Sequence, residues 1–296
     1  MSREKRPGQS GFVLVIVLLV TALLVTVAVE FAHRVYVGVT GLHNLQVMER
    51  LSLETDSLVE SSSGMLQSAL QQGIINAGGP GMQFALENGV TLDFNAGDEN
   101  AKFNVNSVVT QSGDINQDGY ESFQRLLKAI GLDKSIADKL VNWVKAKRAM
   151  ATSAGNTSNT GNSSGLDSIA EFRLFVDTAS YDKLRDYITV FGNGLININT
   201  ASVPVLMSLA DSSGTAVTQE QAQNIVTYRS VQGNYGSIGE LQNTAGCESL
   251  PNALAGKITT SSSAMDLNAR AEQEGIKRIT EAVVDQSGNV LYWREF

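Results

Sequence analysis

The chain has 296 residues, enough for about two domains, with 22 basic and 30 acidic residues and a formal net charge of −8. An acidic chain without a basic block is unsuited to holding nucleic acid by phosphate neutralisation. The single cysteine, Cys247, excludes an internal disulfide and a zinc or iron–sulfur site built from several cysteines. Both histidines, His33 and His43, lie close to an apolar N-terminal segment, so we expect no histidine-based catalytic site in the globular part.

The N-terminus combines a basic leader with an apolar run. Residues 1–11 carry three basic residues and one acidic residue, and the 18 residues 12–29 carry no charge, close to the shortest helix that spans a bilayer. The basic leader predicts a cytoplasmic N-terminus, with the remainder of the chain outside. A plain membrane anchor fits this hydropathy. A cleaved secretory signal is disfavoured because Ala28-Val29-Glu30 is a poor cleavage site.

The junction between leader and apolar run, Gly11-Phe12, resembles the cleavage site of type IV prepilins and type II secretion pseudopilins. The resemblance implies that a prepilin peptidase cuts after Gly11 on the cytoplasmic side and methylates the new N-terminus, Phe12. Removing three positive charges and one negative charge would change the formal net charge from −8 to −10. The alternative is a chance glycine before an ordinary anchor.

The fifth residue after the junction is Ile16, where most members of these families carry glutamate. In those families the glutamate meets the charged N-terminus of a neighbouring subunit inside the bilayer, and a carboxylate there is costly unless it is paired. A subunit with no neighbour above it gains nothing from this carboxylate. The minor pseudopilin K family lacks the glutamate, so Ile16 resembles that family and implies a subunit at the fibre tip.

Helical spacing of apolar residues continues to about residue 72, which predicts that residues 30–72 extend the membrane helix into the periplasm. A continuous helix over 12–72 would be about 90 Å long. The glycine-rich run at 73–81 ends it. Alternating runs at 90–94 and 102–106, and strand-like sequence from 257 to the end, predict a small antiparallel sheet, with a hairpin turn at 286–289 between its last two strands. The prediction is an α+β head, formed by residues 73–106 and 257–296, packed on the long helix.

The middle of the chain, 107–256, consists of amphipathic helical segments and predicts an all-helical domain inserted between the strands. It contains a weak repeat: FNVNS at 103–107 matches ININT at 196–200, and SIAEF at 168–172 matches SIGEL at 237–241. We interpret this as a duplicated helix-hairpin-helix-like unit. The alternative is that Asn and Ser recur because they cap helices. The Ser- and Asn-rich run 151–165 is expected to be an exposed, mobile loop.

The order of these features over residues 8–296 resembles the type II secretion minor pseudopilin K family, including the closing Tyr292-Trp293-Arg294. The resemblance implies a non-enzymatic, single-pass inner-membrane subunit with a periplasmic head and no nucleic-acid partner. It implies as partners the minor pseudopilins I and J, the major pseudopilin, the inner-membrane assembly platform and the prepilin peptidase. The alternatives are a type IV minor pilin or a membrane-tethered DNA-uptake protein and, third, a tethered hydrolase, for which no catalytic motif is present.

One motif indicates metal binding. Asp114, Asn116 and Asp118 have the D-x-N-x-D-G spacing of a calcium loop, and Tyr120 could add its backbone carbonyl. The glutamate that closes an EF-hand falls at Arg125, so only a partial calcium site is expected. The alternative is a glycine turn that caps the next helix. Family resemblance implies acidic residues after Trp143, whereas this chain has three basic residues in 145–148.

The second half of the repeat resembles a helix-hairpin-helix nucleic-acid-binding module, but its sequence departs from that pattern. Ala245-Gly246-Cys247-Glu248 lacks the second glycine of the DNA-binding versions and has an acidic residue in its place. We therefore favour a protein-interaction role for this scaffold, and expect Cys247 to be a small buried apolar residue.

Overall fold

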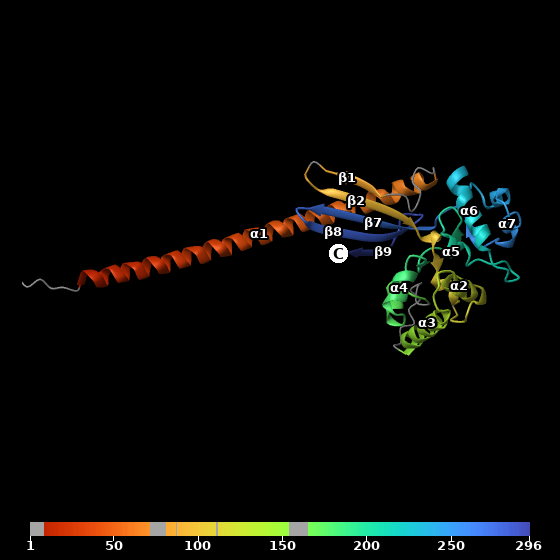
Figure 1. Ribbon diagram of the computed structural model, residues 1–296, viewed down its shortest axis with the longest axis horizontal. Helices are drawn as coiled ribbons and strands as arrows, with labels where there is room; N and C mark the ends of the chain where they lie inside the picture. The colour runs from red at the N-terminus through yellow and green to blue at the C-terminus, as the bar shows by residue number, and fades with distance from the viewer. Residues whose placement is uncertain (1–8, 72–80, 87, 111, 154–164) are drawn as a thin grey trace, which may run out of the picture.

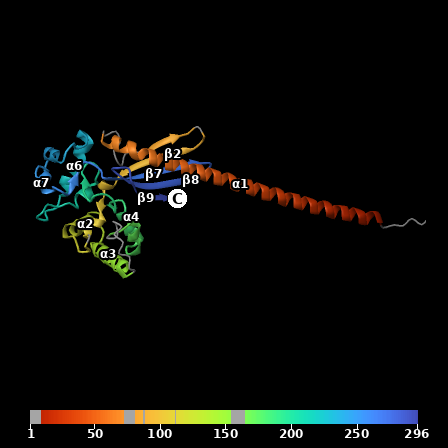
Figure 2. The ribbon, with the colours of Figure 1, turned by 180° about the vertical axis from the view of Figure 1, so that it is seen from behind.

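The computed structural model describes residues 9–71, 81–86, 88–110, 112–153 and 165–296. Residues 1–8 of the expected leader lie outside the described residues, as do most of the loops expected at 73–81 and 151–165. A long N-terminal helix leads to a five-stranded sheet, and a mostly helical insertion follows beyond the end of the sheet (Figure 1). The view from behind shows the insertion again at the end opposite the free part of the helix (Figure 2). This arrangement confirms the predicted α+β class.

Helix α1 runs without interruption over Gln9–Gln71, 63 residues, as the apolar spacing predicts. Its second half packs on the sheet through buried residues that are spaced four apart. This spacing keeps them on one side of the helix, because four residues advance a helix by only about 40° beyond a full turn. The residues buried on this face are Val47, Leu51, Thr55 and Val59.

The sheet has the order β1-β2-β7-β8-β9, and every neighbouring pair is antiparallel. Strands β7 and β8, with 10 residues each, form a hairpin at its centre. The strand-like C-terminal sequence therefore supplies most of the surface on which α1 packs. The turn between β8 and β9 falls where the sequence predicts it, after Asp285. The strands are β1 (Met82–Ala85), β2 (Thr91–Asp98), β7 (Ala264–Gln273), β8 (Ile276–Asp285) and β9 (Val290–Glu295).

The core between helix and sheet is apolar with one polar contact. Alanines 269, 271 and 282 are buried on the sheet side, and their small side chains let the helix approach closely. At the centre of the interface the hydroxyl of Thr280 donates to that of Thr55 at 2.8 Å, which in turn donates to the carbonyl of Ser52. Both threonines are therefore satisfied although they are fully buried.

The insertion occupies the chain between the end of β2 and the start of β7. It contains four very short strands as well as helices, so it is mostly rather than entirely helical. Its helices are α2 (Gln117–Ala129), α3 (Ser135–Ser153), α4 (Thr178–Leu184), α5 (Val203–Leu206), α6 (Gln219–Gln232) and α7 (Leu250–Ala253). The 3-10 helices are η1 (Glu99–Ala101), η2 (Val105–Val108), η3 (Ile169–Leu174) and η4 (Ile238–Asn243), and the strands are β3 (Phe103–Asn104), β4 (Ile188–Thr189), β5 (Ile196–Asn197) and β6 (Ile258–Thr259).

The run 102–106, predicted as a strand of the head, belongs instead to the insertion. Only β3 forms there, and it pairs in parallel with β4 rather than joining the five-stranded sheet. Phe103 and Val105 are buried in the core of the insertion, where Phe103 stacks on Phe123. Alternation of apolar residues identified the strand at Phe103–Asn104, but Val105 and Asn106 belong to the 3-10 helix η2, and the pattern could not tell which sheet the strand joins.

The two halves of the insertion repeat one backbone arrangement. In the first, β3 pairs in parallel with β4, and in the second, β5 pairs in parallel with β6. The side chain of Asn106 bonds both the N–H and the C=O of Leu166 and also the C=O of Val190, so it joins the start of η3 to the end of β4. The matching bonds in the second half join Asn199 to Tyr235 and Thr260.

Replacing Leu51 by alanine is expected to destabilise the protein by about 2–5 kcal/mol, because Leu51 is fully buried between helix and sheet. Leu53, on the same helix but 67% exposed, is the matched control, and its replacement by alanine is expected to change stability by less than about 0.5 kcal/mol. Denaturant unfolding of the full chain in detergent measures both. Equal losses for the two variants would contradict the packing described above.

Candidate assembly surface and sequence-predicted sites

The predicted cleavage junction lies inside helix α1. Gly11 and Phe12 are both helical, and Phe12 and Ile16 are 68% and 45% exposed. The most apolar 18-residue window of this helix has a mean hydropathy of 3.2 and is 0% buried. The helix is thus long and apolar enough to cross a membrane, and its apolar side chains must be covered by lipid or by other helices.

Three exposed apolar side chains beyond the predicted membrane segment share one side of α1, with the exposed Glu49 on the same side between Leu42 and Leu53. Val35, Leu42 and Leu53 are 47%, 64% and 67% exposed, and at 100° per residue they share one side of the helix. That side faces away from the sheet, because Leu53 is turned by about 200° from the buried Leu51. Leu53 lies about 36 Å beyond residue 29, which is too far for a bilayer to cover it.

We call Val35, Leu42 and Leu53 the back stripe. Helical spacing of apolar residues predicts the helix but does not by itself separate its two faces. The signal that could do so is the four-residue spacing of Val47, Leu51, Thr55 and Val59. These residues mark the face that packs on the sheet, and the back stripe lies outside that face.

The calcium motif forms the end of a small hairpin and the first turn of helix α2. An isolated bridge joins Val109 to Ile115, and Asn116 donates its N–H to the carbonyl of Val108. The second half of the insertion builds the same hairpin, with a bridge between Ala210 and Ala216, although its sequence there lacks the D-x-N-x-D-G spacing. The hairpin is therefore a structural part of both repeats.

The four candidate ligands do not fit a calcium site in this arrangement. Helix α2 starts at Gln117, so Asp118 and Tyr120 belong to a helical turn instead of a loop that wraps an ion. Within the described part of the chain, no three His, Cys, Asp or Glu side chains are grouped to hold a metal ion. Three candidates have side-chain partners: Asp114 accepts from Ser112, Asn116 donates to the Ser107 carbonyl, and Asp118 pairs with Lys257 at 2.7 Å. The fourth, the backbone carbonyl of Tyr120, lies inside helix α2.

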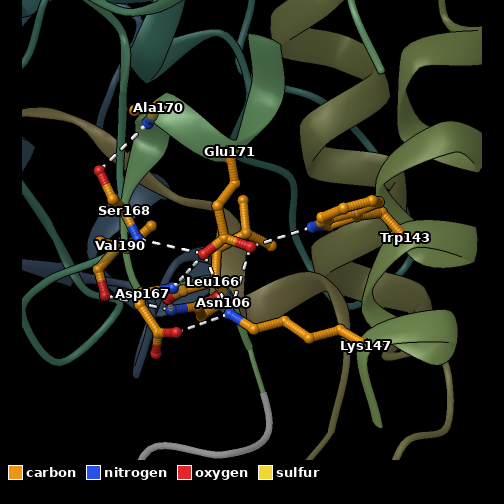
Figure 3. A network of polar contacts seen from close by, with 9 residues as sticks. All are labelled: Asn106, Trp143, Lys147, Leu166, Asp167, Ser168, Ala170, Glu171 and Val190. Carbon is orange, nitrogen blue, oxygen red and sulfur yellow. Dashed lines mark hydrogen bonds and ion pairs between the residues drawn. The ribbon is translucent and has the colours of Figure 1, made fainter. Parts of the chain in front are cut away.

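Lysine 147, from the basic run after Trp143, lies among carboxylate oxygens. Its ammonium contacts Asp167 at 2.7 Å and both oxygens of Glu171 at 3.0 and 3.2 Å (Figure 3). The indole of Trp143 donates to the same glutamate at 3.0 Å. Burial raises the pKa of Glu171, but the hydrogen bonds from Trp143, the Asp167 backbone N–H and Lys147 outweigh it, so this pKa lies below its usual value. A lysine of the chain itself therefore supplies the positive charge that faces the carboxylates of Asp167 and Glu171.

The hairpin at Gly246 does not offer a free phosphate-binding N–H. The backbone N–H of Gly246 donates to the carboxylate of Glu248 at 3.1 Å, and the Gly246 carbonyl accepts from Gln221. An acidic side chain thus takes the position that a phosphate would need. Cys247 is buried, and burial raises the pKa of its thiol to about 11, so it is a poor nucleophile.

Comparisons with known proteins agree with this architecture. Two family models, both described as type II secretion system (T2SS) protein K, match residues 101–193 and 196–261, more than half of the chain together. Their boundary falls between the two repeats. The chain is 28% identical over 258 residues to the type II secretion system protein K of Pseudomonas aeruginosa, covering 77% of this chain and 74% of that protein.

A solved structure has the same fold. It is a chain in the crystal structure of the GspK-GspI-GspJ complex from the type 2 secretion system of enterotoxigenic Escherichia coli. The match has a TM-score of 0.56 with 14% identity, and it covers 86% of this chain and 98% of that one. At this identity the likeness extends to the fold alone.

Replacing Glu171 by glutamine is expected to cost about 1–3 kcal/mol at pH 7, because Lys147 loses its charged partner. Since the folded-state pKa of Glu171 is lowered, the stabilisation is present above the unfolded value of about 4.3 and is lost as the pH falls through the folded value. Denaturant unfolding at pH 7 and at about pH 3 measures this difference.

The matched control for that experiment is Glu240→Gln. Glu240 holds the equivalent place in the second repeat, where its carboxylate accepts the Gly236 N–H. A smaller and less pH-dependent loss is expected. A Glu171→Gln cost that does not change between the two pH values would contradict the assigned charge pairing.

Proposed function

Because the chain belongs to the type II secretion system protein K family, we propose that it is the minor pseudopilin at the tip of a type II secretion pseudopilus, where it starts fibre assembly for export of folded proteins. The observation that carries this proposal is the position of the insertion, which lies beyond the sheet, opposite the free part of helix α1 (Figure 1). A helical fibre cannot easily repeat such a head, so a single copy at the end is favoured. The role is assembly, with no catalytic step.

The proposed protein is made with a leader that a prepilin peptidase removes after Gly11, leaving Phe12 as the N-methylated mature end. Support comes from the order of the two segments at this junction, where a leader with three basic residues is followed by an apolar run of 18 uncharged residues. By the same charge asymmetry the leader stays in the cytoplasm and the head is periplasmic, with a single crossing of the inner membrane.

Ile16 supports a place at the tip. A charged side chain inside the bilayer is costly unless a partner offsets the cost, which reaches about 2.5–3.5 kcal/mol at the centre of a membrane helix. In a subunit with a neighbour above it, the positive N-terminus of that neighbour is the partner. A subunit at the end of the fibre has no such neighbour, and isoleucine at this position avoids the cost.

The proposed partners below the tip are the minor pseudopilins I and J, followed by the major pseudopilin, with the inner-membrane assembly platform driving growth. The related Escherichia coli chain was crystallised in a complex with GspI and GspJ, which supports these two partners. On this chain the back stripe is the surface that suits them, because its three side chains are apolar and exposed and Leu53, the farthest from the membrane segment, is out of reach of lipid.

Mature protein isolated from membranes is expected to begin with N-methylated Phe12, which mass spectrometry of the N-terminal peptide measures. Replacing Gly11 by valine is expected to block the cut, because a peptidase pocket shaped for glycine excludes a branched side chain. Mature wild-type protein that retains Met1 would reject the processing step.

Replacing both Leu42 and Leu53 by serine is expected to weaken co-purification with the minor pseudopilins at least tenfold, because each buried leucine contributes about 1.5–3 kcal/mol. Cross-linking in membranes followed by affinity capture measures it, together with export of a secreted protein. Leu174→Ser is the matched control, since Leu174 is 66% exposed but lies on η3 in the insertion. If capture of the double variant is unchanged, the back stripe is not part of the interface.

A further inference from the structure

The insertion is joined to the sheet by two chain segments that meet at one place. Residues 98–103 lead out of β2 and residues 259–264 lead back into β7, and the last residue of β2, Asp98, pairs with Met265 at the start of β7. Compact bodies joined by short connections are expected by default to move relative to one another, with the connections as hinges. Here they are instead surrounded by buried polar side chains that bond across the connection.

Asn100 is the centre of this arrangement. Its side chain is 2% exposed and makes four hydrogen bonds, which use all the capacity of an amide. Its oxygen accepts the backbone N–H and the hydroxyl of Ser263, at 2.7 and 2.8 Å, on the returning segment. Its nitrogen donates to Asn193 and to the Leu195 carbonyl, at 2.8 and 2.7 Å, on the link between the two repeats.

Asp98 reaches from the sheet into the second repeat. Its Oδ2 accepts from the side chains of Asn197 and Thr200 at 2.8 and 2.5 Å, and its Oδ1 accepts the backbone N–H of Asn100 at 2.7 Å. The residue is 3% exposed. Rotating the insertion away from the sheet would leave a buried carboxylate without these donors, which is a costly arrangement.

A buried ion pair holds the first repeat in the same way. The Lys102 ammonium lies 2.7 Å from Glu99 and 3.6 Å from Asp266 on β7, and Thr189 on β4 donates to the other oxygen of Glu99. Burial raises the pKa of Glu99, since its carboxylate is almost fully withdrawn from water. This group therefore joins the first repeat to the sheet beside the bonds of Asp98 and Asn100.

Contacts farther out act in the same direction. Phe191, at the end of the first repeat, packs on Tyr292 of β9 with 5.9 Å between ring centroids. The side chain of Gln286, in the turn before β9, donates to the carbonyl of Ser262 on the returning segment at 2.6 Å. Both contacts fix the insertion to the far edge of the sheet.

We propose that Asp98, Asn100 and the Glu99–Lys102 pair form a rigid interlock that fixes the insertion in one orientation on the sheet and thus relative to helix α1. The interlock acts within one chain and needs no partner. Its members bond the outgoing segment to the link between repeats and to the returning segment, so no rotation of the insertion preserves all of their bonds.

Pulsed electron paramagnetic resonance on the full chain in detergent tests the interlock. Spin labels are attached to exposed sites in two variants, Glu49→Cys with Lys139→Cys and Glu49→Cys with Gln223→Cys, which report on α1 against each repeat. The native Cys247 is buried and unreactive at neutral pH, so it stays unlabelled. The intact interlock is expected to give one narrow distance distribution for each pair.

Adding Asn100→Ala is expected to broaden both distributions, because the two segments and the repeat link lose their common partner. Asn106→Ala is the matched control: it removes a partly buried amide whose three hydrogen bonds lie within the first repeat, and both distributions should keep their width. Unchanged widths in folded Asn100→Ala, or equal broadening by both variants, would overturn the proposal. If Asn100→Ala does not fold, the double variant Thr200→Ala with Ser263→Ala decides, and unchanged widths there would also overturn it.

Discussion

The burial of one face of helix α1 against strands β7 and β8 is the constraint from which the other features follow. The sheet covers only the second half of the helix, where Val47, Leu51 and Val59 are buried, so the apolar first half has to find its cover outside the chain. The same packing leaves the back stripe facing away from the sheet. Because β2 and β7 are neighbours, the inserted chain leaves and returns at one end of the sheet, and helix, sheet and insertion follow one another along the molecule.

The parts of the fold that depend on local pattern could be predicted from the sequence. Uncharged residues at 12–29 and helical spacing beyond them indicate the long helix, and alternation at 276–285 with a turn at 286–289 indicates the closing strands. The Asn-x-Asn repeat indicated the duplication because Asn106 and Asn199 bond the same backbone positions in the two halves. A residue type predicts local structure in this way when its side chain is needed to hydrogen-bond a particular backbone group.

Sequence reasoning failed where the partner is distant along the chain. The spacing of Asp114, Asn116 and Asp118 indicates calcium only if nothing else claims these side chains, and Lys257, far away in sequence, pairs with Asp118. The role of Asn100 was missed for the same reason, since its partners at 193, 195 and 263 are joined to it only by the fold. Buried polar networks of this type leave no periodic trace in the sequence.

The two repeats of the insertion share a single hydrophobic core, which contains Phe123 and Phe172 of the first and Ile225 and Tyr235 of the second. In a solenoid each unit contacts only its neighbours, so units can unravel one at a time from an end. A fused pair with one common interior has no such intermediate, and its melting is expected to be all-or-none. Duplication has here produced two copies with one common interior, so neither copy is expected to stay folded when it is excised from the other.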